Sequence, residues 1–349
     1  MVRLYEEADK IKYEKFVTAH KNGSFLQSSF WGQIKKEWEN VILISENENG
    51  EIKGAVSLLI RRMPIPVFKV TVAYAPRGPV CDYNDYETFN ELISAAKAEA
   101  KKRGACLLKF DPDKSYLNSE LISAAKAHGL KIKVHGLAYE NMQPICNHKI
   151  NLSEFENEED IIKKLNYKTR NQIRSGEKRG AVVVNGSEKD IPEFYEIIKE
   201  TEARKNIALR NEEYYYKMLK EIPSEHLVFL LAKAEDKVIA GAIFIIYGKT
   251  VTYSYSAMAN GVSKYNANYV IQHEILKEGV RRGCEIYDMG GVDGNNLSEG
   301  VAVFKKNFGG EVIRNIGELD LVMKPFEYFL FNFSIGTGRK ILKLIKRKK

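Results

Sequence analysis

Residues 101–111, KKRGACLLKFD, and residues 280–288, VRRGCEIYD, repeat one local pattern. In each stretch, basic residues and a glycine close a predicted helix before a short strand that ends on aspartate. A second echo lies upstream of each stretch, as KGAVSLLI at 53–60 and AGAIFIIY at 240–247. These pairs lie about 180 residues apart, whereas solenoid repeats recur every roughly 20–50 residues, so they predict a duplicated domain.

The sequence around these echoes predicts the same order of elements twice: a strand meander, a helix and a further strand. The first pass is predicted to form strands at 41–45, 55–61 and 69–74, a helix at 86–103 and a strand at 105–110. The second pass is predicted to form strands at 227–234, 239–247 and 250–257, a helix at 269–282 and a strand at 285–289. This order is the layout of acetyltransferase-like folds.

The predicted fold is therefore α/β (α+β), with two tandem GNAT-like acyltransferase domains. The length of 349 residues suits two domains. We place the first domain at 1–150 and the second at 151–319, and we expect residues 320–349 to pack back on the first domain or on a membrane. Between the two passes we expect helices at 158–179, 192–204 and 211–221, without the sustained heptads of a coiled coil.

Composition excludes several classes of protein. Charged residues make up 29% and hydrophobic residues 44% of the chain, as in ordinary globular proteins. No stretch of about 18 uncharged apolar residues occurs, and residues 1–16 lack the apolar run of a signal peptide, so we expect a cytoplasmic protein. The four cysteines lie far apart without a CxxC pair or a nearby histidine pattern, which argues against a disulfide framework and against a metal site.

The net charge of +8 is concentrated at the C-terminus. Residues 339–349, RKILKLIKRKK, carry seven basic side chains and no acidic one. Together with the preceding FEYFLFNFSIGTG, this end combines aromatic, aliphatic and basic residues, as interfacial helices do. The sequence therefore predicts peripheral contact with the anionic inner face of the cell membrane, with a disordered solubilising tail as the alternative.

Eight further motifs occur in order from about residue 24 to residue 332. They are FLQSSFWGQIKKEW, YAPRGPVCD, LLKFDPD, NMQPICNHKINL, LNYKTRNQIRSGEKRGAVV, ARKNIALRNEEYYYKML, YDMGGVDG and FKKNFGGEVIRNIGELDLVMKPFEYFLF. In this order they resemble the FemABX family of peptidoglycan bridge-forming aminoacyltransferases. The lack of a coiled-coil arm makes the chain similar to the short, FemX-like type.

The resemblance implies a reaction without a cofactor. An amino acid, Ala, Ser or Gly, would pass from aminoacyl-tRNA to an amine on the stem peptide of a peptidoglycan precursor. The basic tail favours a lipid-linked precursor, lipid II, over a soluble nucleotide-linked one. Aminolysis of an ester needs orientation and charge stabilisation more than a nucleophile, which fits a sequence without a nucleophile elbow or a triad.

Two residues carry the chemistry in this interpretation. Lys305 matches the lysine that the family places near the reacting ester and the terminal ribose, where it would stabilise the oxyanion; a surface lysine is the alternative. Asp111 ends a predicted strand and, following the family motif, would orient or deprotonate the acceptor amine; a turn aspartate is the alternative. We expect its counterpart in the second repeat, Asp288, to brace the GG turn that follows.

Other residues are assigned to the precursor. Lys35 and Lys36 follow Trp31 at helical spacing, and Arg210 lies four residues before Tyr214, which would put that pair on one helix face. In the family the matching positions grip the diphosphate, sugar and peptide, and Arg and Lys suit phosphate. Tyr253 and Tyr255 alternate in a predicted strand and should share one face. We expect the substrate-binding residues to lie in a cleft between the repeats, with packing as the alternative role for the aromatic ones. These residues are Lys35, Lys36, Trp38, Arg210, Tyr214, Tyr253 and Tyr255.

The predicted helix at 158–179 is strongly basic. Lysine and arginine neutralise phosphates in the sequence-independent part of nucleic-acid binding, so this segment could steer the tRNA acceptor arm; a solvated helix face is the alternative. The residues assigned to tRNA are Lys163, Lys164, Lys168, Arg170 and Arg174.

Two other functions stay open at this point. The same fold could serve an acyl-CoA-dependent N-acyltransferase acting on a small amine, although the glycine loop Q/RxxGxG/A that grips pyrophosphate is missing after the central strands. The chain could also be a non-catalytic protein that binds tRNA and membrane.

Overall fold

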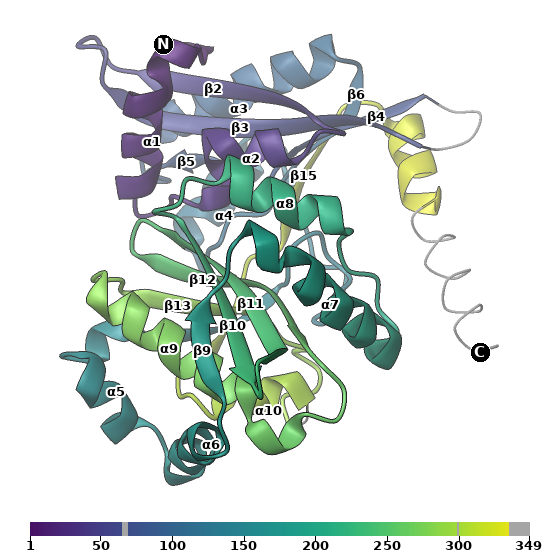
Figure 1. Ribbon diagram of the computed structural model, residues 1–349. Helices are drawn as coiled ribbons and strands as arrows, with labels where there is room; N and C mark the ends of the chain where they lie inside the picture. The colour runs from purple at the N-terminus through teal and green to yellow at the C-terminus, as the bar shows by residue number, and fades with distance from the viewer. Residues whose placement is uncertain (65–68, 299, 335–349) are drawn as a thin grey trace. The chain divides into compact units, whose positions relative to one another are not determined.

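The computed structural model describes residues 1–64, 69–298 and 300–334 (Figure 1). The chain divides into two compact units, and each has its own sheet and core. Of the described residues, the first unit contains 1–64, 69–135, 141–143 and 315–334, and the second contains 136–140, 144–298 and 300–314.

The sheet of the first unit follows the order β1, β2, β3, β4, β6, β15, β7, and β5 pairs with β3. These strands are β1 (Val2–Leu4), β2 (Glu39–Glu46), β3 (Ile52–Met63), β4 (Val70–Ala75), β5 (Val80–Cys81), β6 (Ala105–Phe110), β7 (Lys131–Lys133) and β15 (Glu318–Val322). All neighbours are antiparallel except β4 and β6, which are parallel because a helix crosses over between them.

The helices of the first unit are α1 (Lys10–Ala19), α2 (Ser29–Ile34), α3 (Tyr86–Lys102) and α4 (Ser119–Ala127). Helix α3 is the crossover, and its residues Phe89, Leu92, Ala96 and Ala100 are buried at helical spacing. They pack with strand residues such as Leu58 and Leu108, so this apolar stripe forms the core of the unit.

The sheet of the second unit follows the order β14, β8, β13, β12, β11, β10, β9. Its strands are β8 (Cys146–Asn151), β9 (Val182–Asn185), β10 (Leu227–Ala234), β11 (Lys237–Tyr247), β12 (Thr250–Met258), β13 (Ile286–Gly291) and β14 (Glu311–Arg314). Its helices are α5 (Glu158–Lys164), α6 (Tyr167–Lys178), α7 (Ile191–Lys205), α8 (Glu212–Glu221), α9 (Ala267–Arg281) and α10 (Gly300–Lys306). Helix α9 packs on one face of the sheet and α7 on the other (Figure 1).

The duplicated layout is confirmed. Strand β4, helix α3 and strand β6 repeat as β12, α9 and β13, with a parallel strand pair in each unit. The repeated glycines explain the sequence echo: Gly104 and Gly283 each follow the arginine that caps a crossover helix, with φ of +73° and +65°. A side chain is disfavoured in this left-handed conformation, so glycine is the residue that ends both helices.

The predicted boundary between the domains differs from the structure. Strand β8 begins at Cys146 and pairs with β13 and β14, so the residues before 150 already belong to the second sheet. The expected single helix at 158–179 is also wrong. It is interrupted at Leu165 and Asn166, where buried Leu165 is extended and the Asn166 side chain caps a new helix by accepting from the Thr169 amide.

The C-terminal part of the described chain returns to the first unit. Strand β15 lies between β6 and β7, and residues 325–334 form a helix. The basic stretch 339–349 falls outside the described residues. Over the described ranges, every helix is too short or too polar to cross a bilayer.

Candidate active site

The parallel strands of the second unit separate near their ends. Strands β12 and β13 pair only from Thr250 to Thr252 and from Ile286 to Asp288. Beyond Asp288 the chain turns through Gly290, whose φ is +79°. A Cβ at Gly290 would lie 3.5 Å from the Tyr253 carbonyl oxygen and 3.7 Å from Lys305 Nζ. The turn therefore brings a backbone segment without a side chain close to Lys305, the residue that we assigned to the ester from the sequence.

Lys305 reaches this turn from helix α10. Only 5% of the residue is exposed, and its Nζ donates a hydrogen bond of 2.8 Å to the Gly291 carbonyl oxygen. Burial lowers the pKa of the Lys305 ammonium to about 8, against the opposing effect of the Asp288 charge. The ammonium is therefore the main form at neutral pH, but it is held with little hydration, which strengthens its interaction with any developing negative charge.

Asp288 braces the same turn, as the sequence predicted. Its carboxylate accepts from the Gly290 amide at 2.7 Å and from Asn147 Nδ2 at 3.0 and 3.1 Å. Asn147 and Asp288 are both buried. Asn147 lies within the motif NMQPICNHKINL but was not among the predicted site residues. Its partner, Asp288, becomes apparent only once β8 pairs with β13 in the sheet.

Asp111 lies in the first unit, directly after β6. Its carboxylate is buried and accepts from Tyr74 Oη at 2.6 Å and from the Arg77 amide at 2.7 Å. Arg77 Nη1 also donates to the Asp111 carbonyl oxygen at 3.2 Å. Burial raises the pKa of this carboxyl group to about 6, although both hydrogen bonds favour the charged form. The group can therefore exchange a proton near neutral pH.

The structure changes the account of Lys35, Lys36 and Trp38. Helix α2 ends at Ile34, so neither lysine continues the helix, contrary to the predicted spacing. Lys35 Nζ lies 4.5 Å from the centre of the Trp31 ring, and Lys36 is exposed. Trp38 is partly buried, with the Arg61 guanidinium 5.7 Å from its ring centre, and packs on the cluster around Val70 and Val72.

Arg210 and Tyr214 are neighbours, but for a different reason from the one predicted. Helix α8 begins at Glu212, so Arg210 lies before the helix and the pair does not share a helix face. The chain folds back so that the Arg210 guanidinium lies 5.1 Å from the Tyr214 ring centre. Tyr255 Oη donates to Tyr214 Oη at 3.2 Å, which completes a cluster of one arginine and two tyrosines.

Tyr253 and Tyr255 point to opposite faces of the sheet, so the predicted shared face is wrong. The register between β11 and β12 shifts at this point: Tyr255 pairs with Ile243 and Tyr253 with Phe244, which leaves Ser254 as an extra residue. Tyr253 stacks on Phe244 at 5.2 Å in the core beneath α9, whereas Tyr255 contacts Tyr214 and Tyr215 of α8. The bulge reverses the alternation on which the prediction relied.

The basic segment contains both exposed and paired residues. Lys163, Lys168 and Arg174 are exposed. Lys164 forms an ion pair with Asp160 at 2.7 Å, and Arg170 Nη1 donates to the Lys163 carbonyl oxygen at 3.0 Å.

The start of α6 is fixed beside the end of α10. The Asn166 and Thr169 side chains donate to the Asn307 carbonyl oxygen at 2.7 and 2.6 Å. The basic helix therefore begins next to a residue that follows Lys305 by two positions. Nothing in the local sequence pattern indicates this link, because the polar residues of α6 and α10 are far apart in the chain.

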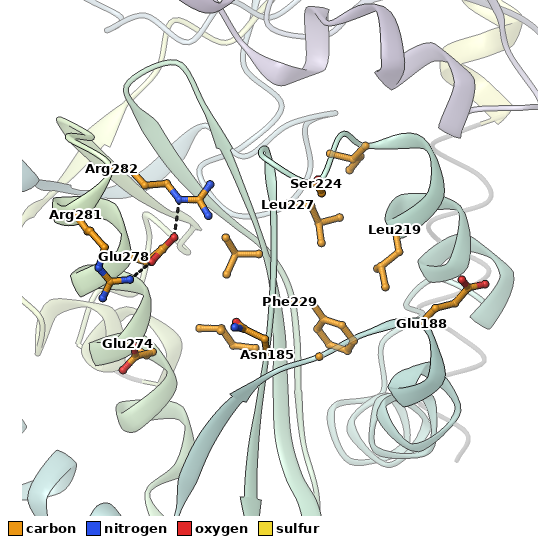
Figure 2. Close-up of a pocket in the computed structure, with 14 residues that line it drawn as sticks. Asn185, Glu188, Leu219, Ser224, Leu227, Phe229, Glu274, Glu278, Arg281 and Arg282 are labelled. Atoms are coloured by element: carbon orange, nitrogen blue, oxygen red, sulfur yellow. Dashed lines mark hydrogen bonds and ion pairs between the residues drawn. The ribbon is translucent and has the colours of Figure 1, made fainter.

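A separate pocket of about 510 Å³ lies where β9 ends beside β10 in the second sheet (Figure 2). Leu227 and Phe229 line it on β10, and Arg281 and Arg282 line it at the C-terminal end of α9. Both arginines pair with Glu278, as Figure 2 shows, and Arg282 Nη1 donates to the Glu225 carbonyl oxygen at 2.6 Å. The two arginines are therefore paired within the protein, and the pocket contains none of the predicted site residues.

The cysteines and acidic residues supply no metal centre in the described chain. Cys81, Cys106, Cys146 and Cys284 are buried free thiols. Within residues 1–64, 69–298 and 300–334, no group of three His, Cys, Asp or Glu side chains is arranged to hold a metal ion.

Comparisons with known proteins found relatives along most of the chain. The FemAB family model matches residues 9–237 and 232–334. The UDP-N-acetylmuramoylpentapeptide-lysine N(6)-alanyltransferase of Weissella viridescens is 27% identical over 91% of this chain and 94% of its own length. A lipid II:glycine glycyltransferase of Staphylococcus haemolyticus is 25% identical over 91% of this chain and 93% of its own.

Solved structures resemble the same fold. A crystal structure of FemX aligns with a TM-score of 0.84 at 21% identity, covering 95% of this chain and 99% of its own. A tandem GNAT protein from the clavulanic acid biosynthesis pathway aligns with a TM-score of 0.58 at 9% identity, covering 92% and 98%. The predicted pair of GNAT-like domains is thereby confirmed as a fold.

Proposed function

The chain belongs to the FemAB family, and on this premise we propose that it transfers an amino acid from aminoacyl-tRNA to the stem-peptide amine of a peptidoglycan precursor. The relatives are named as alanyl- and glycyltransferases, and the chain is accordingly a transferase. The observation that carries the proposal is the buried Lys305 ammonium, which is held on the Gly291 carbonyl oxygen where β12 and β13 separate. We propose lipid II as the acceptor and Ala, Ser or Gly as the residue transferred.

The proposed reaction is the aminolysis of an ester. The neutral acceptor amine attacks the ester carbonyl, a C–N bond forms, and the C–O bond to the terminal ribose breaks. The amine loses one proton, and the leaving ribose oxygen gains one. Lys305 donates a hydrogen bond to the oxyanion of the tetrahedral intermediate, and Asp111 orients or deprotonates the acceptor amine. The shifted pKa values of the two groups support these roles, because at neutral pH Lys305 is mainly protonated and Asp111 mainly ionised.

We assign the precursor's phosphates and sugar to two groups of side chains. In the second unit, Arg210 offers a fork of donors beside Tyr214 and Tyr255, so the arginine is oriented by aromatic faces. In the first unit, Lys35 lies over Trp31, and Lys36 and Trp38 follow it. Tyr253 is withdrawn from this set, because it packs beneath α9.

A direct assay tests the function. The purified protein is incubated with lipid II or the nucleotide-linked precursor and with tRNA charged with Ala, Ser or Gly, and the products are analysed by mass spectrometry. We expect one added residue on the stem peptide. Absence of product with all three donors would contradict the proposal. Acyl transfer from acyl-CoA instead would favour the small-amine acyltransferase, and binding of tRNA and membrane without transfer would favour a non-catalytic role.

We further propose that α5 and α6 bind the tRNA backbone. Changing the exposed residues Lys163, Lys168 and Arg174 to alanine should weaken tRNA binding and lower the slope of log Kd against log salt by about two to three, since each cation that neutralises a phosphate adds about one to that slope. The turnover number at saturating tRNA should stay unchanged. The measurement is filter binding of charged tRNA at several salt concentrations.

The control for this prediction removes the same charge elsewhere. Lys101, Lys102 and Lys126 are exposed helical lysines of the first unit, and their triple alanine variant should retain the wild-type salt slope. Equal slopes for the two triple variants would show that the basic helices act only as a solvated surface.

We propose a cytoplasmic location at the inner face of the membrane. The support is the sequence of residues 339–349, whose seven basic residues would each gain about 1 kcal/mol near an anionic surface. Such contact would bring the enzyme to a lipid-linked precursor.

A further inference from the structure

The helix at residues 325–334 exposes three phenylalanines. Phe326, Phe329 and Phe333 are 68%, 63% and 62% exposed, and their spacing of three and four residues places them on one face. The rings of Phe329 and Phe333 stack with their centres 6.2 Å apart. Single exposed apolar residues are normal on protein surfaces, but three phenylalanines gathered on one helix face indicate an interaction surface. We call these three residues the phenylalanine face.

The opposite side of this helix is fixed to the first unit. Phe331 is buried against Val70, Val72 and Leu107. Tyr328 Oη donates to Asp320 Oδ2 of strand β15 at 2.9 Å. The helix therefore has a defined orientation, and the exposure of the phenylalanine face follows from packing on its other side. The helix cannot rotate to bury these rings without breaking the packing of Phe331 and the hydrogen bond of Tyr328.

Basic residues adjoin this helix and follow it in the sequence. Lys133 Nζ lies 4.7 Å from the centre of the Tyr328 ring, and Lys324, directly before the helix, is exposed. The acidic residue within the helix, Glu327, pairs with Lys324 at 3.2 Å. Further along the chain, the sequence has seven basic residues and no acidic one between 339 and 349. An apolar ring surface on a helix that adjoins basic residues and precedes a basic stretch of sequence matches a surface with an apolar interior and anionic head groups.

We propose that the phenylalanine face is a membrane-docking surface that inserts into the interface of an anionic bilayer. The three rings would leave water for the boundary between head groups and acyl chains, and the basic residues would contact anionic lipid. This contact differs from attraction of the basic tail alone, because burial of rings is insensitive to salt, whereas attraction between exposed charges is screened. The proposal rests on the membrane location proposed above, but it does not depend on the transfer reaction.

The test measures binding of the full-length protein to vesicles by flotation. The probes are vesicles of phosphatidylcholine alone and vesicles that also contain phosphatidylglycerol. The test variant carries Phe326→Ser, Phe329→Ser and Phe333→Ser. The matched control carries Ile11→Ser, Leu117→Ser and Val182→Ser, which remove equally exposed apolar side chains elsewhere. We expect the test variant to partition onto anionic vesicles about tenfold or more weakly than the wild type, and the control to bind normally.

A second comparison separates the contribution of the phenylalanine rings to vesicle binding from that of the basic residues. Deletion of residues 339–349 should remove the salt-dependent part of binding and leave a residual part at high salt, and the phenylalanine variant should lose that residual part. Unfolding is monitored by circular dichroism, and the helix signal and melting transition should be those of the wild type, because the changed side chains are exposed. Wild-type vesicle binding by the phenylalanine variant would overturn the proposal. So would a change from dimer to monomer without any change in vesicle binding, which would identify the surface as a contact between two copies.

Discussion

Replacement of Lys305 by alanine is expected to lower the rate of amino-acid transfer about 100- to 1000-fold, the usual cost of removing one oxyanion donor. The fold should persist, because burial lowers the pKa of Lys305 to about 8 and the charged side chain therefore opposes folding at neutral pH. Single-turnover transfer from charged tRNA measures the rate, and thermal unfolding measures stability. Lys306→Ala is the matched control, since Lys306 is the exposed neighbour on the same helix.

The pH dependence of the Lys305 effect gives an independent readout. The ammonium form is the one that stabilises an oxyanion, and it is lost as the pH rises through about 8. The acceptor amine also titrates at high pH, but it does so equally in wild type and variant. The ratio of the wild-type rate to the Lys305→Ala rate should therefore fall above pH about 8. A ratio that stays constant across that range, or an equal loss in Lys306→Ala, would contradict the proposed role.

Replacement of Asp111 by asparagine is expected to lower transfer about 100- to 10,000-fold if the carboxylate takes the amine proton. Asparagine keeps the size of the side chain and an acceptor oxygen for the Arg77 amide, and Tyr74 Oη, which donates to the carboxylate in the wild type, can accept from the new amide group. The raised pKa of Asp111, about 6, means that its ionisation reduces stability as the pH rises through that value. The neutral variant should consequently retain a cooperative melting transition at pH 7.

Two pH measurements separate a chemical role of Asp111 from a structural one. The wild-type rate, divided by that of Asp111→Asn, should fall as the pH drops through about 6, because the carboxylate is then protonated. In Tyr74→Phe this midpoint should move to higher pH, because the Tyr74 hydrogen bond lowers the pKa of Asp111. A midpoint that Tyr74→Phe leaves in place would show that the titrating group is a different one.

The local sequence patterns predicted the helices and strands accurately where these elements are regular. Strands β6 and β10 lie at the predicted residues, since continuous β-forming runs between turn signals are readable from sequence. The predictions failed where one residue alters a regular pattern. Asn166 starts a new helix within the expected 158–179 helix, and the extra residue Ser254 turns Tyr253 away from Tyr255. Caps and bulges of this kind depend on partners that periodicity does not reveal.

The sequence by itself determined the duplicated fold and the family, because both rest on short motifs and on their order along the chain. Only the tertiary structure decided which of these residues have altered chemistry. Lys305 has a pKa of about 8 because α10 places its amine against the Gly291 carbonyl oxygen in a buried turn. Phe331 is buried while Phe329 is exposed because the helix at 325–334 packs one side on the first sheet. Burial is a property of contacts between distant segments, and it sets both the charge state of a lysine and the accessibility of a phenylalanine.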